Sequence, residues 1–310
     1  IIGAGAWGAA LCHLYATAEA RVTMWARRDY AVERCNNLRV CASLPGVDLH
    51  QNITATTAFH DLADCPILIY ALPAQHLRDF LQTHRPRGGQ IFVIAAKGIE
   101  LASGKVLTDV VADVVGPDVQ TAVLTGPNFA REVALGLPAA ATLAATDPDV
   151  LSMLHPVLST ATYRVYPTTD VVGASVGGAM KNVLAIACGI VDGLKLGDNA
   201  RAAVITRGLA EMARLAVAMG GQRETLMGLC GMGDAILSCT SAQSRNYRYG
   251  LALADGDPHS LRDDSTVEGI ATASAVVPLI GQLGIEMPIA VAVAACINGQ
   301  MSVEQAVAAL

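Results

Sequence analysis

The feature that most limits how this chain can fold lies at its beginning, where three glycines are spaced as G-x-G-x-x-G. Gly3, Gly5 and Gly8 follow a short apolar stub and precede a helical run over residues 9–16. In a strand–turn–helix, the first glycine makes the tight turn, the second lets the backbone approach a pyrophosphate, and the third lets helix pack on strand. The helix N-terminus then offers free N–H groups to the phosphates. We therefore expect a dinucleotide-binding unit at this end of the chain.

The first half of the chain alternates short β-rich runs with helical patterns. Several runs are continuously apolar, which is typical of a sheet covered on both faces by helices. Strand–helix alternation also predicts parallel strands with right-handed crossovers. The expected strands are Ile1–Ile2, Arg21–Trp25, Pro66–Leu72, Gln90–Ala96, Thr121–Thr125, Ala139–Ala145 and Thr162–Tyr166.

The pattern changes at about Val171, where strand signals stop and long stretches rich in Ala, Leu, Val and Gly begin. The clearest of these predicted helices are Val171–Leu194, Ala200–Met219 and Ala271–Leu283. A loop-like run, Pro167–Asp170, precedes the change. We predict an α/β domain over residues 1–170 and an all-helical domain over residues 171–310, with a loop at Asp255–Asp264.

Composition and charge limit the classes of partner. The chain has 310 residues, of which 15% are charged and 53% hydrophobic, which excludes a disordered protein. The richest apolar stretch, Ala275–Ile297, is interrupted by Gln282, Glu286 and two prolines, so it falls short of the roughly 20 uninterrupted residues that span a bilayer. A net charge of −6 argues against nucleic acid as the main partner. We therefore expect a small-molecule partner, with no nucleic acid and no stable membrane insertion.

The cysteines and histidines give no sign of a metal site. The eight cysteines contain no C-x-x-C pair and the seven histidines no H-x-x-x-H, although a zinc site needs clustered ligands. Scattered cysteines in a long chain are typical of reduced core residues, so we expect a cytoplasmic protein without a metal.

The end of the second strand bears on the choice of cofactor. An acidic residue there would hydrogen-bond the ribose 2′-OH of NAD. The strand is instead followed by Arg27 and Arg28, and Asp29 comes slightly late. Two guanidinium groups suit a 2′-phosphate. We expect NADP(H) and/or NAD(H) as cofactor and hypothesise that Arg27 favours NADPH; a solvated basic turn is the alternative.

Two lysines occupy unusual places. Lys97 follows an apolar strand at its carboxyl end, where ligands of open parallel sheets bind, although a charge can simply emerge there. Lys181 lies in a helix that is apolar on almost every side, and it shares one face with Gly173 and Gly177. Such a face permits close approach by a ligand or by another backbone. A buried ammonium pairs or lowers its pKa, and a lowered pKa suits a general acid or base; snorkelling to water is the alternative.

Further polar residues interrupt the apolar helices. Asp234 follows Gly231-Met232-Gly233 in a position typical of an N-cap, which is as good an explanation as a site role. Ser244, Arg245 and Asn246 together offer several hydrogen-bond donors that suit a phosphate, and a solvated loop is the alternative.

Taken together, these motifs resemble the NAD(P)-dependent glycerol-3-phosphate dehydrogenases of the soluble bacterial type, nearly end to end. The segments that carry the resemblance are GAGAWG (3–8), AAKGIE (95–100), GPNFARE (126–132), GLPAA (136–140), GGAMKNVLAIA (177–187), DG (192–193), NARAAVITRGLAEM (199–212), GMGD (231–234), SRNYRYG (244–250) and VEG (267–269). The resemblance implies a Rossmann domain followed by a helical domain like that of 6-phosphogluconate dehydrogenase. It also implies interconversion of dihydroxyacetone phosphate and sn-glycerol 3-phosphate, which supplies glycerophospholipid synthesis.

The resemblance implies roles for individual residues. Lys181 matches the lysine that exchanges a proton with the C2 oxygen, with Lys97 and Asp234 completing the catalytic set. The implied substrate contacts are Lys97, Gly126, Asn128, Lys181, Asp234, Ser244, Arg245 and Asn246, with Arg245 on the phosphate side. The implied cofactor contacts are Gly3, Gly5, Ala6, Trp7, Gly8, Arg27, Lys97, Ala130, Arg245, Thr266 and Glu268, the last two from a loop that closes over the cofactor. Asn128 stands where Ser or Thr is common, and Ala96 replaces a frequent Thr.

Two other kinds of function remain open at this point. Another reductase of this architecture, such as a β-hydroxyacid dehydrogenase or a ketopantoate reductase, would not need a phosphate site at residues 244–246. A nucleotide sensor would not need a proton donor such as Lys181. A homodimer is also expected as an option, because the apolar final helices, Ile289–Ile297 and Val303–Leu310, suit either core or interface.

Overall fold

The computed structural model describes residues 1–258 and 266–309, and the chain forms two compact units. The N-terminal unit comprises residues 1–96 and 108–171, and the helical unit comprises residues 97–107 and 172–310. The chain passes from the N-terminal unit into the main part of the helical unit after residue 171, next to the expected boundary at residue 170. The assignment of residues 97–107 to the helical unit was not expected, because nothing in their local pattern distinguishes them. Residues 259–264 of the expected loop Asp255–Asp264 lie outside the described residues.

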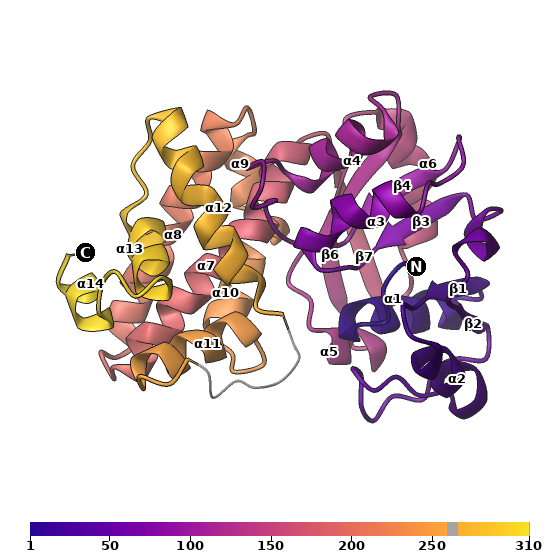
Figure 1. The fold of residues 1–310 in the computed structure, drawn as a ribbon, viewed down its shortest axis with the longest axis horizontal. Coiled ribbons are helices and arrows are strands. Elements are labelled where there is room, and N and C mark those ends of the chain that lie inside the picture. The colour runs from indigo at the N-terminus through magenta and orange to yellow at the C-terminus, as the bar shows by residue number, and fades with distance from the viewer. Residues whose placement is uncertain (259–265, 310) are drawn as a thin grey trace. The chain divides into compact units, whose positions relative to one another are not determined.

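The N-terminal unit is built on one sheet, coloured from indigo to magenta in Figure 1. Its strands are β1 (Val22–Trp25), β2 (Ile53–Thr56), β3 (Ile67–Tyr70), β4 (Ile91–Ile94), β5 (Thr121–Thr125), β6 (Ala139–Ala144) and β7 (Tyr163–Thr168). β3 to β7 are neighbours in chain order, and β2 pairs with β1 in parallel. Ile2 bridges Trp25 and Tyr70, so the N-terminal stub lies between β1 and β3. The fold-class prediction, an α/β Rossmann-type unit followed by an all-helical one, is confirmed.

Two details of the sheet differ from the prediction. β5 and β6 are antiparallel, with Val123 opposite Ala144, so the expectation of parallel strands is wrong for this pair. The connection between them holds only the short helix α5 (Ala130–Ala134), too little for the usual crossover helix, and the chain returns in the opposite direction. β2 was not predicted, because its four residues include two threonines and it lies at the edge of the sheet, where the apolar signal is weak.

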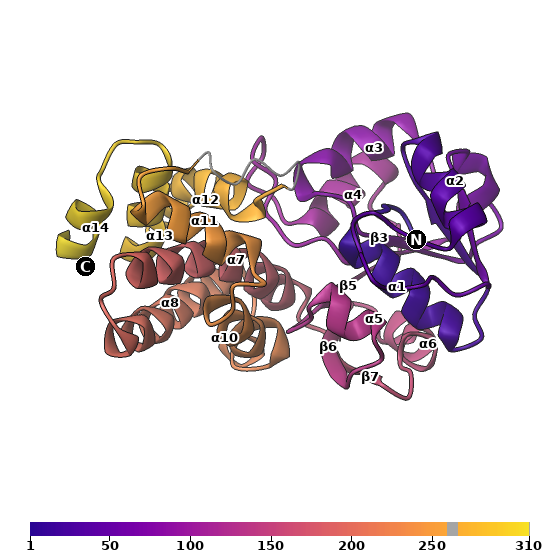
Figure 2. The same ribbon diagram turned by 90° about the horizontal axis from the view of Figure 1, so that it is seen from below.

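Helices cover both faces of this sheet, as the continuous apolar strands predict. They are α1 (Ala6–Thr17), α2 (Asp29–Leu38), α3 (Leu77–Thr83), α4 (Leu107–Val115), α5 and α6 (Pro148–Leu158), with 3-10 turns η1 (Phe59–Leu62) and η2 (Ala74–His76). Leu11 of α1 and Leu154 of α6 share one core with Val93 of β4. On the opposite face of the sheet, Phe80 of α3 packs edge-on against Tyr70. Figure 2 shows α3 on one side of the sheet and α1 on the other.

The helical unit contains α7 (Val171–Gly193), α8 (Asp198–Ala218), α9 (Arg223–Leu226), the π-helical segment η3 (Leu229–Gly233), α10 (Asp234–Cys239), α11 (Arg245–Ala254), α12 (Glu268–Leu283), α13 (Pro288–Ile297) and α14 (Val303–Ala309). α7 is long and apolar enough to cross a membrane, but 89% of its most apolar window is buried inside the protein. Ile289 and Val293 of α13 lie in the hydrophobic core of the helical unit, so of the two uses expected for this helix the structure shows core packing. In α14 only Ala306 is buried, and Leu310 lies outside the described residues.

Candidate active site

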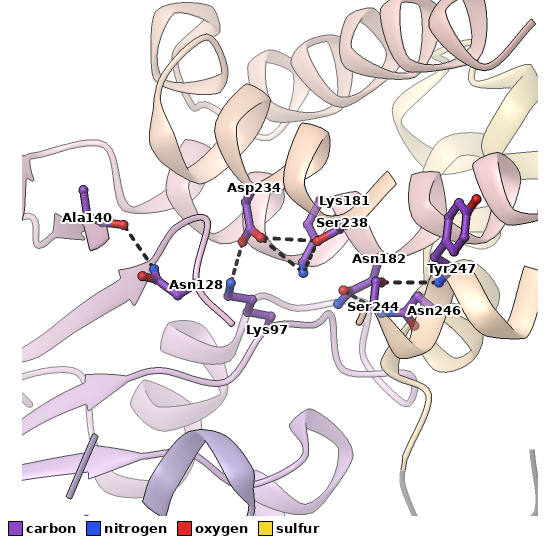
Figure 3. A network of polar contacts seen from close by, with 10 residues as sticks. All are labelled: Lys97, Asn128, Ala140, Lys181, Asn182, Asp234, Ser238, Ser244, Asn246 and Tyr247. Carbon is purple, nitrogen blue, oxygen red and sulfur yellow. Dashed lines mark hydrogen bonds and ion pairs between the residues drawn. The ribbon is translucent and has the colours of Figure 1, made fainter. Parts of the chain in front are cut away.

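Two lysines and one aspartate form a buried charged cluster in the helical unit (Figure 3). Lys97 begins the 97–107 segment, Lys181 lies in the middle of α7, and Asp234 is the first residue of α10. The Nζ of Lys97 lies 2.5 Å from Oδ2 of Asp234, and the Nζ of Lys181 lies 3.2 Å from Oδ1. Asp234 is 1% exposed, Lys181 12% and Lys97 16%. One carboxylate thus serves two ammonium groups, and neither lysine extends freely into water.

The position of Asp234 decides against one of its two explanations. Gly233 occupies the N-cap of α10, so the helix-cap explanation is wrong; the carboxylate of Asp234 accepts a hydrogen bond from Lys97 and forms an ion pair with Lys181. One turn later, Ser238 accepts a 2.8 Å hydrogen bond from Lys181 Nζ. Sequence analysis missed Ser238; its spacing of four residues from Asp234 on a helix is the signal that could have found it.

The glycine face of α7 explains why the cluster can form. A Cβ added at Gly177 would lie 2.7 Å from the carbonyl oxygen of Cys230, so the η3 backbone lies directly on α7 there. Of the two uses expected for this face, the structure shows the close approach of another backbone. Because η3 leads straight into Asp234, the contact brings Asp234 within reach of Lys181.

The cluster carries more positive than negative charge. Two ammonium groups and one carboxylate leave a net charge of +1 in a largely buried place. Burial lowers the pKa of Lys97, the charge of Asp234 opposes this, and the charge of Lys181 adds to it. The expectation for Lys181 was that it pairs or has a lowered pKa, and the structure shows it paired with Asp234. A site of this kind stabilises an added negative charge, such as an oxygen that becomes an alkoxide.

A second polar group joins three helices of the same unit. Nδ2 of Asn246 donates to Oδ1 of Asn182 at 2.8 Å, and Oδ1 of Asn246 accepts from the N–H of Gly269 at 2.9 Å. The amide of Asn246 is therefore fixed between α7 and the start of α12, where Glu268 is the first residue. Asn182 was not singled out from the sequence, although it stands next to Lys181 in an apolar helix. Thr266, just before α12, is exposed.

The 244–246 segment is a helix start, so its interpretation as a solvated loop is wrong. Ser244 is the N-cap of α11, and its Oγ accepts from the N–H of Tyr247 at 3.3 Å. Arg245 is the first residue of the helix and is exposed, whereas Ser244 and Asn246 are buried. A guanidinium beside the free N–H groups of a helix N-terminus suits an anion such as a phosphate.

The glycine loop of the N-terminal unit fits a dinucleotide. Gly3 has a φ of +117°, which only glycine adopts readily, and a Cβ at Gly8 would lie 1.9 Å from the Gly3 carbonyl oxygen. At Gly5 the space that a Cβ would fill is open, as a close approach by a pyrophosphate requires. Trp7 and Ala130 pack into the same small cluster beside α1, so two further predicted cofactor contacts lie close to this loop.

Other predicted residues of this unit lie at strand ends. Arg27 and Arg28 follow β1, are exposed, and have no ion-pair partner in the part of the chain that the structure describes. Asn128 follows β5, and its Nδ2 donates to the carbonyl oxygen of Ala140 at 3.1 Å. A Cβ at Gly126 would lie 2.8 Å from the Cα of Ala141, so only glycine fits there. The hydrogen bond to β6 fixes the larger Asn128 side chain.

Comparisons with known proteins agree with these features. A family model described as the N-terminus of NAD-dependent glycerol-3-phosphate dehydrogenase matches residues 1–151, and the C-terminus model matches residues 170–308. "Glycerol-3-phosphate dehydrogenase [NAD(P)+]" from Parvibaculum lavamentivorans is 47% identical, and that from Caulobacter vibrioides 46%; each match covers 100% of this chain and 95% of the relative. The crystal structure of glycerol-3-phosphate dehydrogenase from Coxiella burnetii superimposes with a TM-score of 0.93 at 35% identity, covering 99% of this chain and 96% of that one. The chain therefore belongs to the NAD-dependent glycerol-3-phosphate dehydrogenase family.

Proposed function

We propose that this protein reduces dihydroxyacetone phosphate to sn-glycerol 3-phosphate, reversibly, with NADPH or NADH as the second substrate. The observation that carries the proposal is the buried cluster of Lys97, Asp234 and Lys181 in a chain whose relatives are named glycerol-3-phosphate dehydrogenase [NAD(P)+]. The product would supply glycerophospholipid synthesis. A reductase for unphosphorylated ketones would not need a phosphate site at residues 244–246, and a sensor would not need a proton donor such as Lys181.

The N-terminal unit would hold the dinucleotide, and residues 171–310 would hold the substrate, together with Lys97. When bound, the reduced dinucleotide supplies the hydride that C2 of the substrate receives. Gly5 leaves room for the pyrophosphate, Gly3 makes the turn and Gly8 lets α1 pack closely against it. Arg27 would pair with a 2′-phosphate. The other proposed cofactor contacts are Ala6, Trp7, Lys97, Ala130, Arg245, Thr266 and Glu268.

Lys181 would act as the general acid. Its ammonium group donates a hydrogen bond to Ser238 and forms an ion pair with Asp234, and a further N–H would serve the C2 oxygen of the substrate. As the carbonyl oxygen gains negative charge, Lys181 gives it a proton and Lys97 adds a second positive charge. Positioned proton transfer of this kind contributes roughly 10²–10⁴-fold to the rate.

The substrate phosphate would bind at the start of α11. Arg245 supplies the charge there, and Ser244 and Asn246 supply neutral hydrogen-bonding groups. Gly126 and Asn128 are the substrate contacts that we propose from the N-terminal unit.

The test follows absorbance at 340 nm with purified enzyme, dihydroxyacetone phosphate and either NADPH or NADH. We expect oxidation with dihydroxyacetone phosphate and almost none with dihydroxyacetone, which lacks the phosphate. Lys181→Met should lower kcat at least about 100-fold, because the proton donor is lost. Lys195→Met, the same change at an exposed lysine just beyond α7, should leave kcat unchanged. Equal turnover of both ketones, or an active Lys181→Met enzyme, would contradict the proposal.

We further propose that the protein acts in the cytoplasm as a homodimer, without membrane insertion and without a metal. The eight cysteines, all free thiols, support a reducing compartment. Among the described residues, no group of three or more His, Cys, Asp or Glu side chains is arranged to hold a metal ion. Light scattering after size-exclusion chromatography measures the mass of the particle directly, and a monomer would exclude the dimer.

A further inference from the structure

A second charged network lies at the far end of α7, beyond the catalytic cluster. Oδ2 of Asp192 accepts a 2.6 Å hydrogen bond from Nη1 of Arg201, and Nη2 of Arg201 lies 2.5 Å from Oδ1 of Asp198. The same Oδ2 of Asp192 accepts a hydrogen bond from the hydroxyl of Tyr247. The network therefore ties the end of α7 to the start of α8 and to α11.

Tyr247 is held at both ends in the first turn of α11. Its N–H donates to the N-cap oxygen of Ser244, and its hydroxyl reaches Asp192 (the cap is drawn in Figure 3). The first turn of a helix has unsatisfied N–H groups and frays readily, so these two bonds limit its movement. Arg245 lies two residues before Tyr247 in that same turn.

The crossing of α11 over α7 makes the first turn sensitive to this network. A Cβ at Gly189 would lie 2.1 Å from the carbonyl oxygen of Tyr247, and a Cβ at Gly250 would lie 2.1 Å from that of Ile186. These contacts set the distance between the two helices. Two side-chain hydrogen bonds to α7 then fix how the first turn is rotated, one from Asn246 to Asn182 and one from Tyr247 to Asp192.

We propose that Asp192 and Tyr247 are positioning residues, which hold the first turn of α11 so that Arg245 meets the substrate phosphate at a fixed distance from Lys181. Lys181 and Asp192 lie on the same helix, α7, so one rigid element carries both the proton donor and the anchor of the phosphate turn. The inference rests on the proposed function, in which Arg245 binds the phosphate. Burial and the hydrogen bond to Asp192 raise the pKa of Tyr247 to about 12, so its hydroxyl stays protonated and able to donate.

Tyr247→Phe tests this role, because it removes the hydroxyl and keeps the ring. We expect KM for dihydroxyacetone phosphate to rise about five- to tenfold with kcat changed less than twofold, as for lost substrate binding. The affinity for NADPH should stay unchanged. Tyr249→Phe is the matched control: it removes the same atom from the same helix, at a tyrosine that does not contact Asp192, and its KM should equal that of the parent.

An Arg245→Ala background separates positioning from a general loss of structure. If Tyr247 acts through Arg245, Tyr247→Phe should change KM less than twofold once Arg245 is absent. Two results would overturn the inference: an unchanged KM in the parent background, or an equal rise in both backgrounds. Melting temperatures of all variants check that each is folded.

Binding without turnover distinguishes a failed inference from a failed function. Calorimetry with sn-glycerol 3-phosphate and the NADPH-loaded protein measures binding alone, because both molecules are in the reduced state and no hydride can be transferred. Weaker binding in Tyr247→Phe but not in Tyr249→Phe supports the positioning role even if the parent enzyme does not reduce dihydroxyacetone phosphate. Equal binding in all three proteins overturns that role, whatever the activity.

Discussion

Asp234→Asn removes the one carboxylate between two buried ammonium groups. The change raises the net charge of the three-residue cluster from +1 to +2 and removes the carboxylate that pairs with both Lys97 and Lys181, which are 16% and 12% exposed. Removing one partner of a buried pair costs about 3–5 kcal/mol. We expect a loss of about 3 kcal/mol in the free energy of unfolding at pH 7, near the lower limit because a lysine can lose its proton.

The pH dependence of this loss has a definite sign. Burial lowers the pKa of Lys97 and Asp234 raises it, so the substitution should lower it further. A lysine with a lowered folded-state pKa holds fewer protons in the folded than in the unfolded protein, and stability then rises with pH. The gain should appear between the lowered pKa and the ordinary value of 10.5. The free energy of unfolding of Asp234→Asn should therefore fall further below that of the parent at pH 7 than at pH 9.5.

Urea unfolding followed by circular dichroism at both pH values measures this deficit. Asp113→Asn serves as control, because Asp113 pairs with Arg78 at 3.1 Å nearer the surface, where such a pair contributes at most about 1 kcal/mol. Equal stability of Asp234→Asn and parent at pH 7 would refute the reasoning. A deficit that does not change with pH would refute its electrostatic part.

Two further substitutions test close packing and cofactor choice. Gly189→Ala should destabilise the fold by about 1–3 kcal/mol, because its Cβ would lie 2.1 Å from the Tyr247 carbonyl oxygen; Gly281→Ala, on an open helix face, should be neutral or slightly stabilising in the same denaturation assay. Arg27→Ala should lower the NADPH-to-NADH ratio of kcat/KM by about tenfold through loss of a charged hydrogen bond, and the exposed Arg21→Ala should leave the ratio unchanged.

The parts of the fold that the sequence predicts are those with a strong local signal. β4 is apolar at every position and α7 is mostly apolar along its 23 residues, and both lie close to where they were expected. β2 lacks that signal, and the direction of β6 depends on the packing of the connection, which no periodicity records. Local pattern thus predicts elements better than it predicts how they are joined.

The same distinction holds for the site. A lysine in an apolar helix is conspicuous because burying its charge is costly, and Lys181 was identified for that reason. Ser238 and Asn182 are neutral and common enough to pass unnoticed, although each makes a hydrogen bond in the site. For Asp234 the local pattern left a helix cap and a site role equally open, because a carboxylate after two glycines fits either, and only the N-cap at Gly233 separates them.

The allocation of residues 97–107 to the helical unit means that neither unit is encoded by one uninterrupted stretch of the gene. A fragment beginning at residue 171 would lack both Lys97 and Ile99, which is fully buried in the helical core. A chimaera that exchanges residues 1–170 between two relatives would pair the Lys97 of one parent with the Asp234 of the other. Recombination at residue 170 would therefore separate residues 97–107 from the rest of the unit to which they belong.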